Sequence, residues 1–117
     1  EGLVWEALMS AAHFNLTNFS VIVDCNDLQS DGAKKEVMNQ LLLTDKFKSF
    51  GFDTKEINGH DTKELYNALI NKSLTKPNAI IAQTVKGKGV SFMENNKDWH
   101  HGVLTLSQYE LAVKELR

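Results

Sequence analysis

The chain has 117 residues, of which 42% are hydrophobic and 24% are charged, and its formal net charge at pH 7 is −2. This composition is typical of a folded globular domain, excludes intrinsic disorder, and gives no reason to expect nucleic acid or an anionic membrane as a partner. The length suffices for one domain and is too short for two. We expect a cytoplasmic protein, because no signal peptide or membrane-spanning apolar run is evident and the single cysteine, Cys25, cannot form an internal disulfide.

The first elements are a helix and a strand. The chain opens at Glu1 without an initiator methionine, so we expect these residues to be part of a longer polypeptide. Residues 3–14 are rich in alanine and other strong helix formers, which predicts a helix. Residues 19–24 contain β-branched residues and predict a buried strand, and residues 27–32 form a polar turn that ends in glycine.

The middle of the chain predicts further short elements. Residues 34–43 are ambiguous, with a weak helical spacing of apolar residues. Thr44 or Asp45 is expected to cap a short helix that carries Phe47 and Phe50, and Gly51 is expected to end it.

Residues 52–57 alternate as a strand does, and Asn58-Gly59 ends it. Asp61 or Thr62 then caps a predicted helix. The apolar face of this helix is expected to be formed by Leu65, Leu69 and Ile70.

The last part of the chain contains the clearest strand. Residues 79–85 are apolar on both faces, as a central strand of a parallel sheet should be. A glycine-rich exit at residues 86–89, a polar loop at residues 94–102 and a helix at residues 105–116 follow. Helices and strands therefore alternate, which predicts an α/β fold with a parallel sheet flanked by helices.

Asn26 is the first candidate site residue, because it stands where the first strand ends. Ligands bind at the carboxyl ends of strands in parallel sheets. The side-chain oxygen of Asn26 and the backbone carbonyl of Leu28 could bind one Mg²⁺ ion, which takes oxygen ligands and often shares them with phosphates. Considered alone, Asn26 would be interpreted as an ordinary turn former.

Several segments resemble the motifs of a known family, in the same order. They are residues 1–7, 23–32, 58–61, 82–94 and 99–100. Together they resemble the diphosphate-binding domain of the transketolase family, and most closely the split transketolases in which this domain is a separate amino-terminal subunit. The resemblance covers nearly the whole chain and implies that residues 1–117 form the C-terminal portion of that domain.

The resemblance implies two bound groups, thiamine diphosphate and a metal ion, Mg²⁺ or Ca²⁺. Asn26 and Leu28 correspond to metal ligands, and Ser30, Lys86 and Gly87 lie in segments beside the cofactor. Ser30 departs from the family, which more usually has an apolar residue at this position. The Gly-Asp-Gly motif that supplies the family's aspartate ligand would precede Glu1 and is absent from this sequence.

The resemblance also implies catalytic residues. Glu1 and Glu6 correspond to a chain of carboxylates at the subunit interface, although on position alone they could simply favour a helix N-terminus. His100 or His101 corresponds to an active-site histidine near the diphosphate. The doubled histidine leaves the register open by one position, and the following Gly102 favours His101 slightly.

The expected function is the transfer of a two-carbon ketol unit between phosphorylated or modified sugars. The expected partner is a pyrimidine-binding domain or subunit, in a two-fold symmetric assembly with two copies of each. Two alternatives remain open: an enzyme of the deoxyxylulose-phosphate synthase or keto-acid dehydrogenase type, and a non-catalytic α/β module that binds a partner.

Overall fold

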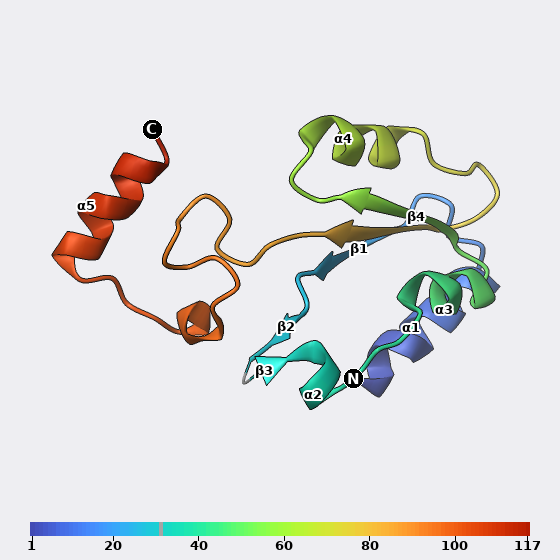
Figure 1. The fold of residues 1–117 in the computed structure, drawn as a ribbon. Coiled ribbons are helices and arrows are strands. Elements are labelled where there is room, and N and C mark those ends of the chain that lie inside the picture. Colours follow the sequence, from blue (N-terminus) through green and yellow to red (C-terminus); the bar gives the residue numbers. More distant parts are fainter. Residues whose placement is uncertain (31) are drawn as a thin grey trace. The chain divides into compact units, whose positions relative to one another are not determined.

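The computed structural model describes residues 1–30 and 32–117, and these residues form two compact units (Figure 1). The first, which we call the sheet unit, consists of Glu1–Cys25 and Leu41–Gln83. The second, the loop unit, consists of Asn26–Gln40 and Thr84–Arg117. Asp31, which belongs to the predicted polar turn, lies outside the described residues.

The sheet unit is built on a three-stranded parallel sheet. Its strands are β1 (Ser20–Cys25), β4 (Asp53–Asn58) and β5 (Asn78–Gln83), in the order β1-β5-β4. β5 is the central strand and is buried from Asn78 to Ala82, as its two apolar faces predict. The expected parallel α/β architecture is confirmed.

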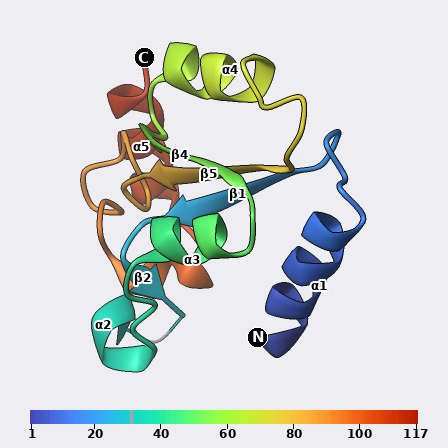
Figure 2. The same ribbon diagram turned by 90° about the vertical axis from the view of Figure 1, so that its right-hand side faces the viewer.

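Helices cover both faces of this sheet. Figure 2 shows α1 (Gly2–His13) and α3 (Leu43–Ser49) on one side of the sheet and α4 (Thr62–Ile70) on the other. The core between the sheet and the helices α1 and α3 is made of small, aliphatic and aromatic side chains. It contains Leu8, Ala11, Cys25, Phe47, Phe52, Ala79 and Ile81.

α4 begins as predicted but buries a different residue. The carboxylate of Asp61 accepts hydrogen bonds from the backbone N–H groups of Lys63 and Glu64, at 2.8 and 3.2 Å. The predicted apolar face is wrong in part: Leu69 and Ile70 are 37% and 53% exposed, whereas Ala68 is buried. A small side chain suits this position, because the backbone carbonyl of Ala68 accepts a hydrogen bond from the Asn78 side chain of β5 at 3.2 Å.

The predicted cap of α3 is wrong. The residue before the helix is Leu42, with a left-handed φ of 57°, and no side chain caps this end. The Thr44 hydroxyl instead donates a hydrogen bond to the Glu56 carboxylate on β4, at 3.1 Å. The predicted end of the helix is confirmed, since Gly51 follows it with φ 90°.

The loop unit contains short elements. β2 (Leu28–Gln29) and β3 (Gly32–Ala33) form a small antiparallel pair, which the sequence did not predict, and α2 (Lys34–Val37) is a single helical turn. A 3₁₀ turn, η1 (Lys97–His100), lies within the predicted polar loop.

The C-terminal helix, α5 (Leu106–Glu115), agrees with its prediction to within one residue at each end. Thr105 and Gln108 form a reciprocal capping box at its start. None of the helices among the described residues is both long enough and apolar enough to cross a membrane.

Candidate functional site

The turn that begins at Asn26 is closed by its own side chain. The side-chain oxygen Oδ1 of Asn26 accepts a hydrogen bond from the backbone N–H of Leu28, at 3.0 Å. Asp27, between them, has a left-handed φ of 57°, which aspartate tolerates better than most residues. The side-chain oxygen of Asn26 is therefore fixed next to the backbone of Leu28.

Lys34 closes the same turn from the other side. Its backbone N–H donates to the carbonyl of Asp27 at 2.8 Å, and its ammonium group lies 2.6 Å from the Asp27 carboxylate. A surface pocket of about 290 Å³ lies here, lined by Asp27, Ala33, Lys34 and Lys35. The pocket is thus lined by two lysines and one aspartate, and Lys34 is paired with that aspartate.

The donor set of this turn fits a hard cation, but only as part of a coordination sphere. An amide oxygen has two lone pairs, so the hydrogen bond from Leu28 is compatible with metal binding by Asn26. Next in the chain, the Oε1 atom of Gln29 is buried and has no hydrogen-bond partner among the described residues. No feature of the sequence indicated this buried acceptor.

The Asp27 carboxylate lies in this turn, but it is paired with the Lys34 ammonium group. The described residues contain no group of three or more His, Cys, Asp or Glu side chains that could hold a metal ion. The oxygen atoms of Asn26 and Leu28 are uncharged, and such ligands usually bind Mg²⁺ together with carboxylates or phosphates. A complete site needs charged ligands in addition to these two.

Lys86 and Gly87 belong to a tightly folded loop. Both residues are half-buried, and Gly87 has φ 71°. A Cβ atom at Gly87 would lie 2.6 Å from both the Cβ and the carbonyl oxygen of Met93. Only glycine fits this position, so the glycine-rich exit from β5 has a steric reason.

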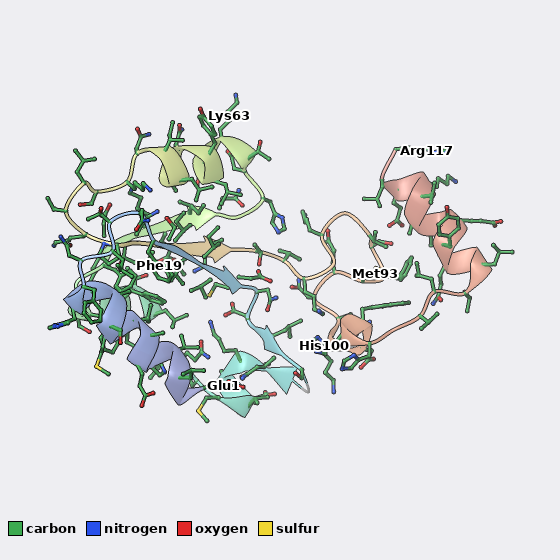
Figure 3. All side chains as sticks on the ribbon, turned by 180° about the vertical axis from the view of Figure 1, so that it is seen from behind. Glu1, Phe19, Lys63, Met93, His100 and Arg117 are labelled. Atoms are coloured by element: carbon green, nitrogen blue, oxygen red, sulfur yellow. The ribbon has the colours of Figure 1, made fainter. Side chains whose placement is uncertain are left out.

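The histidine pair lies in the same unit, at the end of η1. His100 and His101 are both exposed, and their rings are 4.4 Å apart. Figure 3 labels His100 on the 3₁₀ turn and Met93 on the preceding loop. The structure brings the two imidazoles together, and either remains a candidate for the active histidine.

Trp99 anchors the turn that carries this pair. Its indole N–H donates to the carbonyl of Phe92 at 3.0 Å, and the two rings pack 5.3 Å apart. A Cβ atom at Gly102 would lie 2.5 Å from the Trp99 ring. Gly102, after the histidine pair, is therefore required by its packing against Trp99. The sequence had indicated Gly102 only as part of a motif.

The remaining candidates, Glu1 and Glu6, lie in the sheet unit. Glu1 is the N-cap residue of α1, where its side chain makes no capping hydrogen bond, and Glu6 is exposed one turn later. Ser30 is exposed on the turn between β2 and β3. The structure thus gathers Asn26, Leu28, Ser30, Lys86, Gly87 and both histidines in the loop unit, and the two glutamates in the sheet unit.

A family model described as the thiamine diphosphate binding domain of transketolase matches residues 1–116. The chain belongs to the transketolase family. The motif resemblance is confirmed by this match.

Curated transketolase subunits are similar over almost the whole chain. The apulose-4-phosphate transketolase subunits of Phocaeicola vulgatus and Actinobacillus succinogenes are 41% and 37% identical, over 99% and 100% of this chain. The subunit SqwG of a 6-deoxy-6-sulfo-D-fructose transketolase from a Clostridium species is 36% identical over 99% of this chain. This chain spans 42%, 43% and 43% of these relatives, respectively.

Solved transketolase structures share the fold. The enzyme from Campylobacter jejuni superposes with a TM-score of 0.91 at 32% identity, over 99% of this chain and 18% of that one. A transketolase from Pichia stipitis superposes with a TM-score of 0.87 at 22% identity, over 98% of this chain and 18% of that one. The α/β architecture is therefore that of the transketolase thiamine diphosphate-binding domain.

Proposed function

We propose that this chain is the C-terminal portion of the diphosphate-binding domain of a transketolase, and that the complete enzyme transfers a two-carbon ketol unit between sugars. The observation that carries this proposal is the Asn26 turn, which directly follows a strand of the sheet in a chain of this family. Its side-chain oxygen is held by the Leu28 N–H, next to a pocket with two lysines.

In this proposal, Asn26 and Leu28 supply two oxygen ligands to Mg²⁺ or Ca²⁺, and the metal and the cationic surroundings hold the diphosphate. Lys86 supplies further positive charge, and the backbone of Gly87 lies beside the cofactor. Ser30 contributes to the wall beside the cofactor. Thiamine diphosphate, when bound, supplies the carbanion chemistry, and the protein supplies binding and orientation.

The remaining candidates are the histidine pair and the two glutamates. His100 or His101 donates hydrogen bonds to phosphate or to the reacting oxygen atoms. Glu1 and Glu6 join a set of carboxylates at a subunit interface. The partner is a pyrimidine-binding domain or subunit, and the assembly holds two copies of each in the cytoplasm.

The substrates are proposed to be phosphorylated or sulfonated sugars. Support comes from the names of the relatives, which refer to apulose 4-phosphate and to 6-deoxy-6-sulfo-D-fructose. Membership of the transketolase family favours ketol transfer over the two alternatives, a pyruvate-type donor and a non-catalytic module.

Calorimetric titration of the complete two-part enzyme with thiamine diphosphate tests the proposal. We expect binding only when a divalent metal is present, and we expect Asn26→Ala to weaken it by about tenfold or more, which corresponds to ~1.4 kcal/mol. Asn67→Ala, at an exposed position of α4, is the matched control and should bind normally. Unchanged affinity in Asn26→Ala, or binding without metal, contradicts the assignment.

A further inference from the structure

The segment from Lys86 to Asn95, which we call the closed loop, is bonded to itself. The backbone N–H of Asn95 donates to the carbonyl of Lys86 at 2.9 Å. Inside the loop, the Glu94 carboxylate accepts from the N–H of Gly89 at 3.0 Å and lies 3.3 Å from the Lys88 ammonium group. These bonds tie the two ends of the closed loop together and connect Gly89 to Glu94 within it.

The closed loop is bound to α5 through one carboxylate. Ser91 donates two hydrogen bonds to Glu115, the last residue of α5: its backbone N–H to Oε2 and its hydroxyl to Oε1, each at 2.6 Å. Both oxygen atoms of the carboxylate are therefore used, in a fork that fixes the direction of approach. Hydrogen bonds to an ionised carboxylate are short and about twice as strong as bonds between neutral groups.

Leu116, which follows the end of α5, also lies close to the closed loop. A Cβ atom at Gly89 would be 3.0 Å from a methyl carbon of Leu116. Gly89 has φ 94° and Gly87 has φ 71°, which are backbone conformations that glycine adopts without steric strain. Because glycine has access to several backbone conformations, a contact from outside the loop can select one of them.

We propose that Glu115 is a positioning residue, which acts through Ser91 to hold the closed loop in the conformation that binds thiamine diphosphate. This inference rests on the proposed function, because it requires Lys86 and Gly87 to lie beside the cofactor. Glu115 itself does not need to touch the cofactor. The end of the C-terminal helix thereby becomes part of the binding machinery, at a sequence distance of 24 residues from Ser91.

The charge state of Glu115 agrees with this role. The two hydrogen bonds from Ser91, the hydroxyl first and the backbone N–H second, lower the pKa of Glu115, and they outweigh the opposing effects of desolvation and of Glu94. The anchor is therefore ionised at neutral pH, where it accepts both bonds.

Binding of thiamine diphosphate to the complete enzyme with its pyrimidine-binding partner tests the inference, at fixed Mg²⁺ and neutral pH. Glu115→Gln removes the charge and one acceptor, and we expect it to raise the dissociation constant about threefold to tenfold. Ser91→Ala should raise it less, because the backbone bond remains. The double variant should be no weaker than Glu115→Gln alone, since both changes break one link.

The matched control is Glu110→Gln, an exposed glutamate on the same helix. It should bind the cofactor as the unchanged enzyme does, and the melting temperatures of all four variants should agree to within about 2 °C. Equal affinities in Glu115→Gln and Glu110→Gln overturn the inference, and so do strictly additive effects of Ser91→Ala and Glu115→Gln. If the unchanged enzyme does not bind thiamine diphosphate, the proposed function itself fails.

Discussion

In the sheet unit, β5 is buried between two parallel neighbours and packs against aromatic and aliphatic side chains from α1, α3 and Phe52. In the described part of the loop unit, only Val90 and Ala112 are buried hydrophobic residues. Its order comes instead from backbone turns, two positive-φ glycines and carboxylates that bind N–H groups.

This difference in buried apolar area suggests that stability and ligand binding depend on different units. Buried apolar area contributes most of the free energy of folding, so the sheet unit should carry most of the stability of the chain. Loops positioned by a rigid scaffold commonly carry binding groups. All candidate residues for metal and diphosphate binding lie in the loop unit, and substitutions in the two units should have different consequences.

The largest effect on stability is expected from Ile81→Ala on β5. Ile81 is 1% exposed, and truncating such a side chain leaves a cavity that should lower the free energy of unfolding by about 2–5 kcal/mol. Chemical denaturation measures this loss. Ile70→Ala, at a half-exposed position of α4, is the control, and an equal loss there would contradict the contrast between core and surface.

Gly87→Ala should be the most damaging small change in the loop unit. The new methyl group would be forced against Met93, and a non-glycine residue at φ 71° adds strain, together about 1–3 kcal/mol. We expect faster hydrogen exchange at the Asn95 amide, whose bond to Lys86 closes the loop. Gly2→Ala, where no atom lies within 4 Å of the added Cβ, should leave that exchange unchanged.

Asp61→Ala removes the cap of α4 and measures how much a surface hydrogen bond contributes to the stability of the sheet unit, beside the core residue Ile81. Two backbone N–H groups lose their acceptor, which should lower the free energy of unfolding by about 0.5–2 kcal/mol. Thermal or chemical denaturation provides the measurement. Asp61→Asn keeps a side-chain oxygen and should retain most of the stability; a loss as large as that of alanine would argue against the capping role.

The smallest effect is a pH dependence of the Ser91–Glu115 link. Because the folded state lowers the pKa of Glu115, the link is complete above the ordinary pKa of a glutamate and is lost as the pH falls through the lowered value. The amide resonance of Ser91 should therefore shift only in acid, below the ordinary range for glutamate. In Glu115→Gln this shift should disappear, and its persistence would assign the titration to another group.

Local signals predicted the elements of the sheet unit, although the expected burial of the first strand is wrong: β1 is buried only at Cys25, and Ile22 is 52% exposed. The apolar run at residues 79–85 identified the central strand, and the acidic side chain of Asp61 identified a helix start. The errors arose where tertiary contacts outweigh local preference. Thr44 is bonded to a strand rather than to its own helix, and Ala68 is buried in place of larger neighbours.

The loop unit was less predictable for a physical reason. β2 and β3 have two residues each, too few to give an alternating pattern. The Glu115 anchor joins residues 24 positions apart, and an exposed glutamate near a helix end has no local feature that indicates such a partner. The order of motifs in the sequence indicated which loop residues are candidates. The hydrogen bonds that hold these residues could be identified only from the structure.

The alignment of the three strands limits how this protein can change over evolution. Cys25 and Asn58 both lie opposite Gln83, so β1, β4 and β5 finish level with one another. An insertion or deletion of one residue within any of these strands would turn every following side chain of that strand to the opposite face. Length variation among descendants of this sequence should therefore collect in connections such as residues 71–77, and the strands should keep their six residues.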